Sequence, residues 1–318
     1  MNLVFGPVLV TGATGFAGGH LVEHLAGTGR VVAWGRTAPR KELAGLADWQ
    51  TVDLLDRADV QEAIALLRPT TLYHLAGASH VAESWQDTVT PLEGNVLATA
   101  HLLDAIRRAN LDCRVLLTSS SAVYAPSATP ITESGPIAPA NPYALSKLAQ
   151  EQLALRAFTD DGLAVIVVRP FNHTGPRQTP AFVAPAMARQ IALIEQGLVD
   201  PVIRVGNLDA RRDLTDVRDV VRAYSVLMER GQAGEIYNVG SGVGHSIRSI
   251  LDALLSRSAV PVSIETDPAR LRPVETSALV VADATRLRHE TGWQPERSFD
   301  RLLDELLGYW RVKVRSSK

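Results

Sequence analysis

The chain lacks the features that mark several classes of protein. Its single cysteine, Cys113, rules out an internal disulfide and suits a reducing compartment, so a cytoplasmic location is expected. No apolar run approaches the roughly 20 residues that span a bilayer, and no signal-peptide pattern is present, so no membrane association is expected. The net charge of -2 gives no electrostatic argument for binding nucleic acid.

What remains is ordinary for a globular protein: 318 residues, of which 46% are hydrophobic and 21% are charged. Helical patterns alternate with short apolar runs, which predict strands at 8–10, 31–34, 52–54, 71–74, 114–119 and 163–168. This alternation predicts an α/β fold, a Rossmann-type doubly wound parallel sheet with ligands at the carboxyl ends of its strands. Weaker regularity beyond residue 172 predicts a smaller, entwined lobe, which divides the chain into a cofactor domain (1–172) with a return strand near 236–239 and a substrate lobe (173–318).

A glycine-rich stretch, Thr11–Gly18, separates the first strand from a helix that runs to about Ala26. Its spacing, G-x-x-G-x-x-G, lets the backbone approach a pyrophosphate, while the helix N-terminus supplies N–H groups and a positive dipole. The strand–glycine–helix context therefore predicts a dinucleotide site.

The end of the second strand indicates which dinucleotide. NAD-binding folds of this kind usually carry an acidic residue there for the ribose 2′-OH, whereas an arginine accommodates a 2′-phosphate. This chain has Arg36, with no carboxylate before Glu42, so we expect NADP(H). The segment Val52–Leu54 is placed to contact the adenine, and small residues at His74–Gly77 let the backbone pass close to the cofactor.

A second stretch, Asn141–Lys147, predicts a helix start, because Asn141 can cap it and Pro142 fits the first turn. Tyr143 and Lys147 then lie four residues apart on one face. A nearby ammonium favours the phenolate, so we expect the pKa of Tyr143 to fall well below about 10. The hydroxyls of Thr118–Ser121, at the end of a strand, are placed to bond the same substrate oxygen.

One further motif is His20–His24, which matches the H-x-x-E-H pattern of some zinc peptidases. These residues fall on the helix after the glycine loop, and the spacing suggests no third ligand. We therefore expect solvated helix-surface residues and no metal.

Over nearly its whole length the chain resembles the extended short-chain dehydrogenase/reductases, on the order and spacing of Thr11–Gly18, Asn95, Ser120, Tyr143 and Lys147. Its second half resembles the branch of GDP-mannose 4,6-dehydratases and GDP-4-keto-6-deoxy-mannose reductases, at Arg169–Pro176, Gly206–Asp213 and Arg272–Glu275. The segment Asp267–Arg272 resembles the reductases in particular, whereas Ser79–Val81 resembles the dehydratases more.

The resemblance implies that Tyr143 is the general acid/base, that Lys147 bonds the nicotinamide ribose, and that Ser120 polarises the sugar oxygen. It implies an NADP(H) site formed by Gly12, Thr14, Gly15, Phe16, Gly18, Arg36, Asp53, Leu54, Leu75, Ala76, Gly77, Asn95, Tyr143, Lys147 and Arg169. A GDP-linked deoxy-sugar is expected to contact His80, Ser121, Asn172, Arg212, Arg272 and Glu275. Paired guanidiniums suit a diphosphate. A homodimer through the helix at 95–108 and the Tyr143 helix is implied as well.

The residue at position 122 separates two reactions of that branch. A dehydratase must also remove the C5 proton of the sugar, and in this branch a glutamate two positions after the catalytic Ser or Thr does so. That place is Ala122, so dehydration is not supported unless Glu133 or another carboxylate reaches the site. We therefore expect NADPH-dependent reduction of the C4 ketone of GDP-4-keto-6-deoxy-mannose.

The product of that reduction is GDP-rhamnose or its C4 epimer, GDP-6-deoxy-talose, and the sequence does not choose between them. Two enzymatic alternatives remain, a GDP-mannose 4,6-dehydratase and another nucleotide-sugar epimerase or dehydratase. Outside enzymology, an NADP-sensing regulatory protein is the alternative, but such a protein would be expected to have lost Ser120, Tyr143 and Lys147, which are all present.

Overall fold

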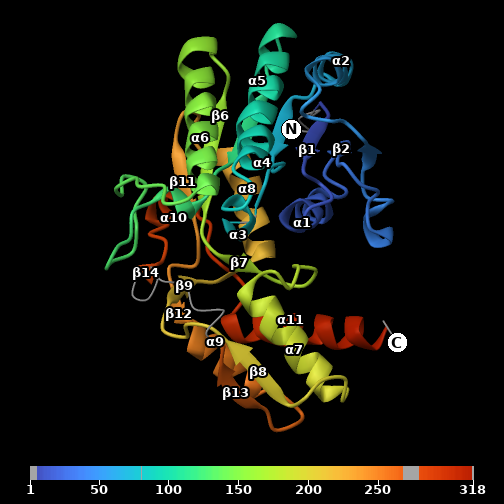
Figure 1. The fold of residues 1–318 in the computed structure, drawn as a ribbon. Coiled ribbons are helices and arrows are strands. Elements are labelled where there is room, and N and C mark those ends of the chain that lie inside the picture. Colours follow the sequence, from blue (N-terminus) through green and yellow to red (C-terminus); the bar gives the residue numbers. More distant parts are fainter. Residues whose placement is uncertain (1–5, 80, 268–278, 317–318) are drawn as a thin grey trace.

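The structure, a computed structural model, describes residues 6–79, 81–267 and 279–316 (Figure 1). Its centre is one sheet of seven parallel strands in the order β11-β6-β5-β4-β1-β2-β3. The strands are β1 (Val8–Thr11), β2 (Val31–Trp34), β3 (Asp48–Gln50), β4 (Thr71–His74), β5 (Arg114–Thr118), β6 (Val165–Pro170) and β11 (Ile236–Val239). The order reverses between β1 and β4, which confirms the predicted doubly wound parallel sheet and places its ligand crevice there.

Helices cover both faces of this sheet, which explains why strands such as β1, β2 and β6 are largely apolar and buried. One face packs against α1 (Phe16–Leu25) and α8 (Val217–Arg230). The other packs against α2 (Arg57–Leu67), α5 (Ala98–Arg108) and α6 (Pro142–Asp161). Figure 1 shows α5 and α6 side by side and nearly parallel.

A smaller lobe lies beyond the carboxyl ends of the strands (Figure 1). Its core is shared by α7 (Val183–Glu195), α9 (Ile247–Leu255) and α11 (Phe299–Arg315), beside the strand pair β8 (Val202–Val205) and β13 (Ser263–Thr266). A three-stranded sheet of β9 (Arg211–Asp213), β12 (Gly244–Ser246) and β14 (Leu279–Val280) and the pair β7 (His173–Thr174) with β10 (Thr215–Asp216) connect it to the main sheet. The chain returns from this lobe to form β11 beside β6, so the two parts are entwined.

The remaining elements are short: α3 (Val81–Ser84), α4 (Val89–Pro91), α10 (Thr285–Thr291) and the single turns η1 (Lys41–Leu43), η2 (Leu92–Leu97) and η3 (Ser121–Val123). Within the described ranges, no helix has the length and apolar character needed to cross a bilayer.

Three elements differ by more than one residue from those predicted from the sequence. β3 pairs with β2 through 48–50, so the segment 52–54 follows the strand instead of forming it. Asn95 does not open an α-helix but lies inside the π-helical turn η2, which precedes α5. β6 begins at Val165 because the N–H of Leu163 still bonds the Ala157 carbonyl at the end of α6.

Candidate active site

The glycine loop forms a cradle that a side chain would fill. Gly12 has φ +67°, and a Cβ there would lie 2.6 Å from the backbone nitrogen of Ala76. A Cβ on Gly18 would lie 2.2 Å from the Gly12 carbonyl oxygen. Gly15 precedes α1, and no side chain in the described part of the chain caps this helix, so its first N–H groups are available to an anion. The loop therefore fits a dinucleotide pyrophosphate.

The residues expected to select the cofactor lie beyond the ends of β2 and β3. Arg36 is exposed, directly after β2. Nearby, Arg40 donates to the Arg177 carbonyl at 3.3 Å. Asp53 is exposed, and its carboxylate accepts from the Leu55 N–H at 3.0 Å. Since carboxyl ends of parallel strands share one edge of the sheet, these residues and the glycine loop border the same crevice.

The α6 helix carries Tyr143 and Lys147, the two residues that the sequence predicts to be catalytic. Asn141 caps it by accepting from the Ala144 N–H at 2.8 Å, with Pro142 at the first position, as the sequence predicted. Tyr143 is buried and hydrogen-bonds to the Ser120 side chain, which follows β5. The prediction that the pKa of Tyr143 is depressed is wrong: burial raises this pKa, against a smaller opposite effect of the hydrogen bond with Ser120. Spacing on a helix identified the pair but could not register how deeply the phenol is buried.

The ammonium of Lys147 is held by two acceptors. Its Nζ donates to the Thr118 carbonyl and to Oε1 of Gln150, each at 2.9 Å. Burial lowers the pKa of Lys147 to about 7, against the opposing effect of the Glu151 carboxylate. Its charge is therefore sensitive to its neighbours near neutral pH.

The side-chain oxygen of Asn95 lies beside Gly77, as does the Lys147 ammonium. Asn95 is buried and donates to the Ser146 hydroxyl at 2.8 Å, but its Oδ1 has no hydrogen-bond partner within the described residues. A Cβ on Gly77 would lie 2.1 Å from that oxygen and 3.4 Å from Nζ of Lys147. A buried acceptor such as Oδ1 of Asn95 needs a hydrogen-bond donor, and a ribose hydroxyl can supply one. The acceptor and the Lys147 ammonium beside Gly77 therefore fit a bound ribose.

Behind the pair, Arg169 and Glu151 form a buried ion pair. All three guanidinium nitrogens of Arg169 already donate within the protein, two to Glu151 and one to the Tyr124 hydroxyl (2.9 Å) and the Glu133 carbonyl (3.1 Å). Glu151 also accepts from the Ser119 hydroxyl at 2.6 Å. The structure thus assigns the Arg169 side chain to the wall behind the site, not to the cofactor contact that we expected.

The expected substrate residues are placed unevenly. Ser121 opens η3 directly after Ser120, whose hydroxyl oxygen accepts from the Ala122 N–H at 3.1 Å. Asn172 is exposed between β6 and β7, and Arg212 lies on β9, donating to the Arg211 carbonyl at 2.9 Å. Three further candidates lie outside the described residues: His80, Arg272 and Glu275.

The carboxylate of Glu133 is engaged elsewhere. Its Oε1 accepts from the backbone N–H of Asn238 on β11 at 2.9 Å, and the Asn238 amide in turn donates to the Ile131 carbonyl at 2.8 Å. Glu133 is therefore fixed to the edge of the sheet. In the described parts of the chain, no carboxylate hydrogen-bonds to Ser120 or Tyr143.

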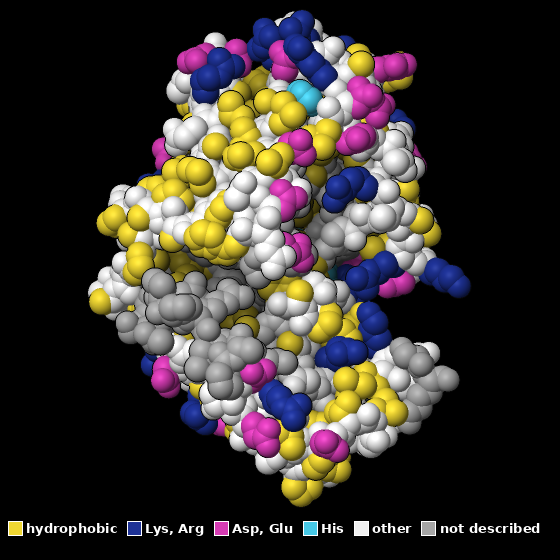
Figure 2. Space-filling model, viewed as in Figure 1, with side chains coloured by type: hydrophobic (Ala, Val, Ile, Leu, Met, Phe, Trp, Pro, Cys, Tyr) yellow, Lys and Arg dark blue, Asp and Glu magenta, His cyan; other side chains and the backbone are white. Residues whose placement is uncertain are grey.

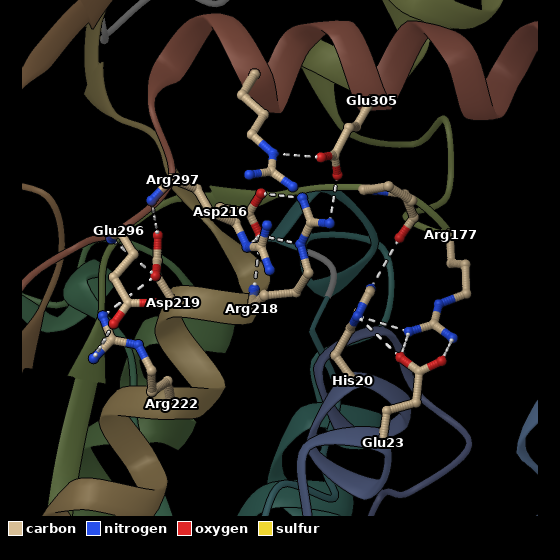
Figure 3. Close-up of polar contacts among 12 residues, drawn as sticks. His20, Glu23, Arg177, Asp216, Arg218, Asp219, Arg222, Glu296, Arg297 and Glu305 are labelled. Carbon is tan, nitrogen blue, oxygen red and sulfur yellow. Dashed lines mark hydrogen bonds and ion pairs between the residues drawn. The ribbon is translucent and has the colours of Figure 1, made fainter.

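Two residues of the H-x-x-E-H motif, His20 and Glu23, form an ion-pair cluster with Arg177 (Figure 3). The Arg177 guanidinium lies between His20 and Glu23, bonding Nδ1 of the histidine at 2.6 Å and both oxygens of the glutamate. His20 is buried, which corrects our expectation of a solvated side chain. Nowhere in the described ranges do three possible metal ligands of the His, Cys, Asp or Glu type gather.

Sequence reasoning missed the buried polar residues next to Lys147 on α6. Gln150 and Glu151 follow Lys147 by three and four positions, one turn along α6, and both are fully buried. The sequence signal that could have found them is a polar residue at a helix position that packs against the sheet, where an apolar residue is the rule.

On the surface, Figure 2 shows Lys and Arg side chains around the hollow between the main body and the smaller lobe.

Comparisons with known proteins agree with this geometry. Residues 9–306 match the family model for GDP-mannose 4,6 dehydratase. The chain is 37% identical to the GDP-6-deoxy-D-mannose reductase of Pseudomonas aeruginosa, covering 97% of this chain and 98% of that one. Its fold matches the structure of RMD from Pseudomonas aeruginosa complexed with NADPH (TM-score 0.85, 35% identity, 97% and 99% covered).

A UDP-glucose 4-epimerase from Thermus thermophilus in complex with NAD is similar in fold, with a TM-score of 0.85 and 28% identity over 96% of this chain and 99% of that one. The chain belongs to the GDP-mannose 4,6 dehydratase family, within the extended short-chain dehydrogenase/reductases.

Proposed function

We propose that this protein reduces the C4 ketone of GDP-4-keto-6-deoxy-D-mannose with NADPH, yielding GDP-D-rhamnose or its C4 epimer GDP-6-deoxy-D-talose. One observation carries the choice of reaction. The site has Ser120, Tyr143 and Lys147 at the carboxyl edge of the sheet, and Ala122 stands where a dehydratase needs a carboxylate. The similarity to a GDP-6-deoxy-D-mannose reductase over nearly the whole chain supports the same choice.

Reduction needs a proton donor at the ketone oxygen, and Tyr143 is suited to that role. Because burial raises the pKa of the phenol, Tyr143 holds its proton at neutral pH and can give it to the sugar oxygen. The Ser120 hydroxyl, bonded to the phenol, stabilises charge developing on that oxygen. The Lys147 ammonium stabilises the phenolate that remains. Bound NADPH supplies the hydride to C4.

The cofactor is held by residues with separate tasks. The glycine loop and the N-terminus of α1 bind the pyrophosphate, Arg36 the 2′-phosphate, and Asp53 with Leu54 the adenosine. Lys147 and Asn95 hold the nicotinamide ribose beside Gly77. The NADPH complex of a structural relative at 35% identity supports this choice of cofactor.

The second proton transfer of a dehydratase has no described group to perform it. Ala122 carries no acid, and Glu133 is bound to the Asn238 backbone. Across the cleft, Arg212 on β9 and Asn172 are proposed to face the diphosphate and the sugar.

We further propose a homodimer formed through α5 and α6. A groove of about 350 Å³ separates these helices, and apolar side chains are exposed on and beside them: Leu97 (44%), Leu145 (54%) and Phe158 (37%). Figure 2 shows apolar side chains gathered over this face. Isolated exposed leucines are common, but such a patch is typical of an interface. The cytoplasmic location expected from the sequence stays a prediction.

The reaction is tested by following NADPH absorbance with purified protein and GDP-4-keto-6-deoxy-mannose, beside a parallel incubation with GDP-mannose alone. We expect stoichiometric loss of NADPH with the keto sugar and no loss of NADPH with GDP-mannose. A keto product formed from GDP-mannose without net use of cofactor would identify a dehydratase instead. NMR of the reduced sugar then gives its C4 configuration.

A further inference from the structure

A buried chain of hydrogen bonds runs beneath the catalytic pair, and its donors and acceptors can be assigned without ambiguity. It begins at Thr99 on α5, whose hydroxyl donates its only proton to the Asn95 carbonyl at 2.6 Å. The same oxygen lies 2.8 Å from Nε2 of Gln150 and 2.8 Å from Nε2 of His74. Since the hydroxyl proton is already used, both nitrogens must donate to it.

This assignment fixes the neighbouring groups. His74 carries its proton on Nε2, so its Nδ1 accepts from the Thr11 hydroxyl at 2.7 Å. The Thr11 oxygen is then left to accept from the Ala76 N–H at 3.3 Å, where the glycine loop meets the turn after β4. His74 is fully buried, and burial lowers its pKa to about 3, so the histidine stays neutral as the chain requires.

The other end of the chain is the amide of Gln150. Because its nitrogen faces Thr99, its oxygen faces Lys147 and accepts from Nζ at 2.9 Å. The Thr118 carbonyl takes a second ammonium proton. The third N–H of the ammonium is thereby left for the spot beside Gly77 where Asn95 Oδ1 is unpartnered.

We propose that Gln150 is the positioning residue of Lys147: its amide oxygen aims the ammonium at the cofactor site, and the chain through Thr99 and His74 to Thr11 fixes the orientation of the amide. The inference rests on the proposed function, in which Lys147 bonds the nicotinamide ribose and supports Tyr143. It adds a link between the lysine and the start of the glycine loop, so that both ends of the cofactor site are held by one set of buried bonds.

Within the described ranges, few charged or titratable groups surround Lys147. Glu151 on α6 favours its protonated form, but this carboxylate is paired with Arg169 on β6. His74 on β4 is neutral, and Tyr143 on α6 is protonated at neutral pH. Against this background, replacing a neutral amide that touches Nζ by a carboxylate or by a hydrocarbon is expected to move the titration of Lys147 in opposite directions.

Two variants test the assignment. Gln150→Glu keeps the shape and adds a negative charge in contact with Nζ, so it is expected to raise the pKa of Lys147 by about 1 to 3 units. Gln150→Leu removes the acceptor and is expected to lower it. Gln190→Glu on α7 is the matched control and should leave the titration in place, because among the described residues its partly buried amide bonds only the helix carbonyl of Ala186.

The primary readout is the pH dependence of NADPH affinity between pH 5 and about 10, followed by nicotinamide fluorescence. It needs no sugar substrate, so it remains valid if the proposed reaction fails. The pH profile of keto-sugar reduction should show the same opposite displacements. If Gln150→Leu does not fold, Thr99→Val replaces it, because valine keeps the shape but removes the hydroxyl that orients the amide. Titrations that stay unmoved in Gln150→Glu, or that move the same way in both variants, would overturn the proposal.

Discussion

At the scale of single residues, the site is explained by how deeply its ionisable groups are buried. Tyr143 and Lys147 shift in opposite directions for the same reason, since burial penalises the charged form of each. Tyr143 thereby keeps its proton and Lys147 becomes responsive near neutral pH. The pair is suited to giving a proton during reduction, with Ser120 bonded to the phenol.

Removing the phenolic hydroxyl tests this account at its central atom. Tyr143→Phe keeps the ring but loses the proton donor, so turnover of the keto sugar should fall by about 10²- to 10⁴-fold. NADPH affinity should stay near that of the wild type in a fluorescence titration. Tyr309→Phe on α11 is the control and should leave turnover unchanged. A Tyr143→Phe enzyme with ordinary activity would remove this residue from its role.

We propose that Arg36 determines cofactor choice; it is exposed after β2 and has no ion pair to any described residue. Arg36→Asp replaces a donor to the 2′-phosphate by a repelling charge. A hydrogen bond to a charged group contributes about 1.5 to 3 kcal/mol, so the ratio of NADPH to NADH affinity should fall by roughly 10- to 100-fold. Calorimetry with both cofactors measures it, beside the exposed Arg204→Asp as a control. An unchanged ratio would count against the 2′-phosphate assignment.

At the scale of elements, α6 carries Tyr143 and Lys147 and also connects several strands of the sheet. Its buried residue Glu151 connects to Ser119 at the end of β5 and to Arg169 on β6. Arg169 continues the contact to Tyr124, whose hydroxyl donates to the Asn238 side chain on β11 at 2.7 Å. The helix, three strands and the segment after η3 are thus connected by a continuous set of buried polar contacts.

Glu151→Gln tests how much these buried polar contacts contribute to the free energy of unfolding. The change leaves the Arg169 guanidinium buried without its anionic partner, which costs about 3–5 kcal/mol of unfolding free energy. Urea denaturation at neutral pH should show that loss as a lower midpoint. Glu265→Gln removes one partner of an exposed pair with Arg204 (3.6 Å) and should cost less than about 1 kcal/mol. Equal losses in the two variants would show that Glu151 is not the centre of the network.

Local elements could be predicted well from the sequence, whereas contacts between residues far apart in the chain could not. The cap at Asn141 and the glycine cradle at Gly12 follow from short-range patterns, and an apolar run predicted the strand at 236–239 that pairs with β6. The burial of Tyr143 and the engagement of Arg169 by Glu151 do not, because both depend on which strands become neighbours after folding. The π-helical turn around Asn95 was missed for a different reason: its residues fit an ordinary helical pattern.

At the scale of the whole molecule, polar clusters join the two parts (Figure 3). Arg218 on α8 pairs with Asp216 and with Glu305 on α11. A second cluster links the turn before α7 to α1, where the Arg177 guanidinium hydrogen-bonds to His20. His20 donates from Nε2 to the Pro176 carbonyl at 3.0 Å, so its Nδ1 must accept from Arg177. Protonation of that nitrogen would break the contact.

This geometry predicts an acid sensitivity. Burial, with a further effect of Arg177, lowers the pKa of His20 from 6.5 to about 4. The pKa of His20 is lower in the folded state than in the unfolded state. The contribution of His20 to the free energy of unfolding is therefore fully present above pH 6.5 and is lost as pH falls from 6.5 to about 4. The difference corresponds to about 3 kcal/mol. The buried His74 and the half-buried His173, whose pKa values are also lowered by burial, add losses of the same sign.

The share of His20 is isolated by His20→Gln, which cannot titrate. Unfolding free energies measured by urea at pH 7, 5.5 and about 4.5 should fall less steeply in this variant than in the wild type. His289→Gln, at an exposed histidine on α10, should keep the wild-type slope. The same slope in His20→Gln and in the wild type would separate the acid sensitivity from this contact.

The most direct test of the central claim follows the transferred hydrogen. Purified protein is incubated with GDP-4-keto-6-deoxy-mannose and NADPH carrying deuterium at the reactive C4 position of the nicotinamide, and the sugar product is examined by NMR and mass spectrometry. The account predicts one deuterium per product molecule, on sugar C4, with an equal amount of cofactor oxidised. Product without deuterium at C4, or conversion of GDP-mannose to a keto sugar with no net oxidation of cofactor, would contradict it.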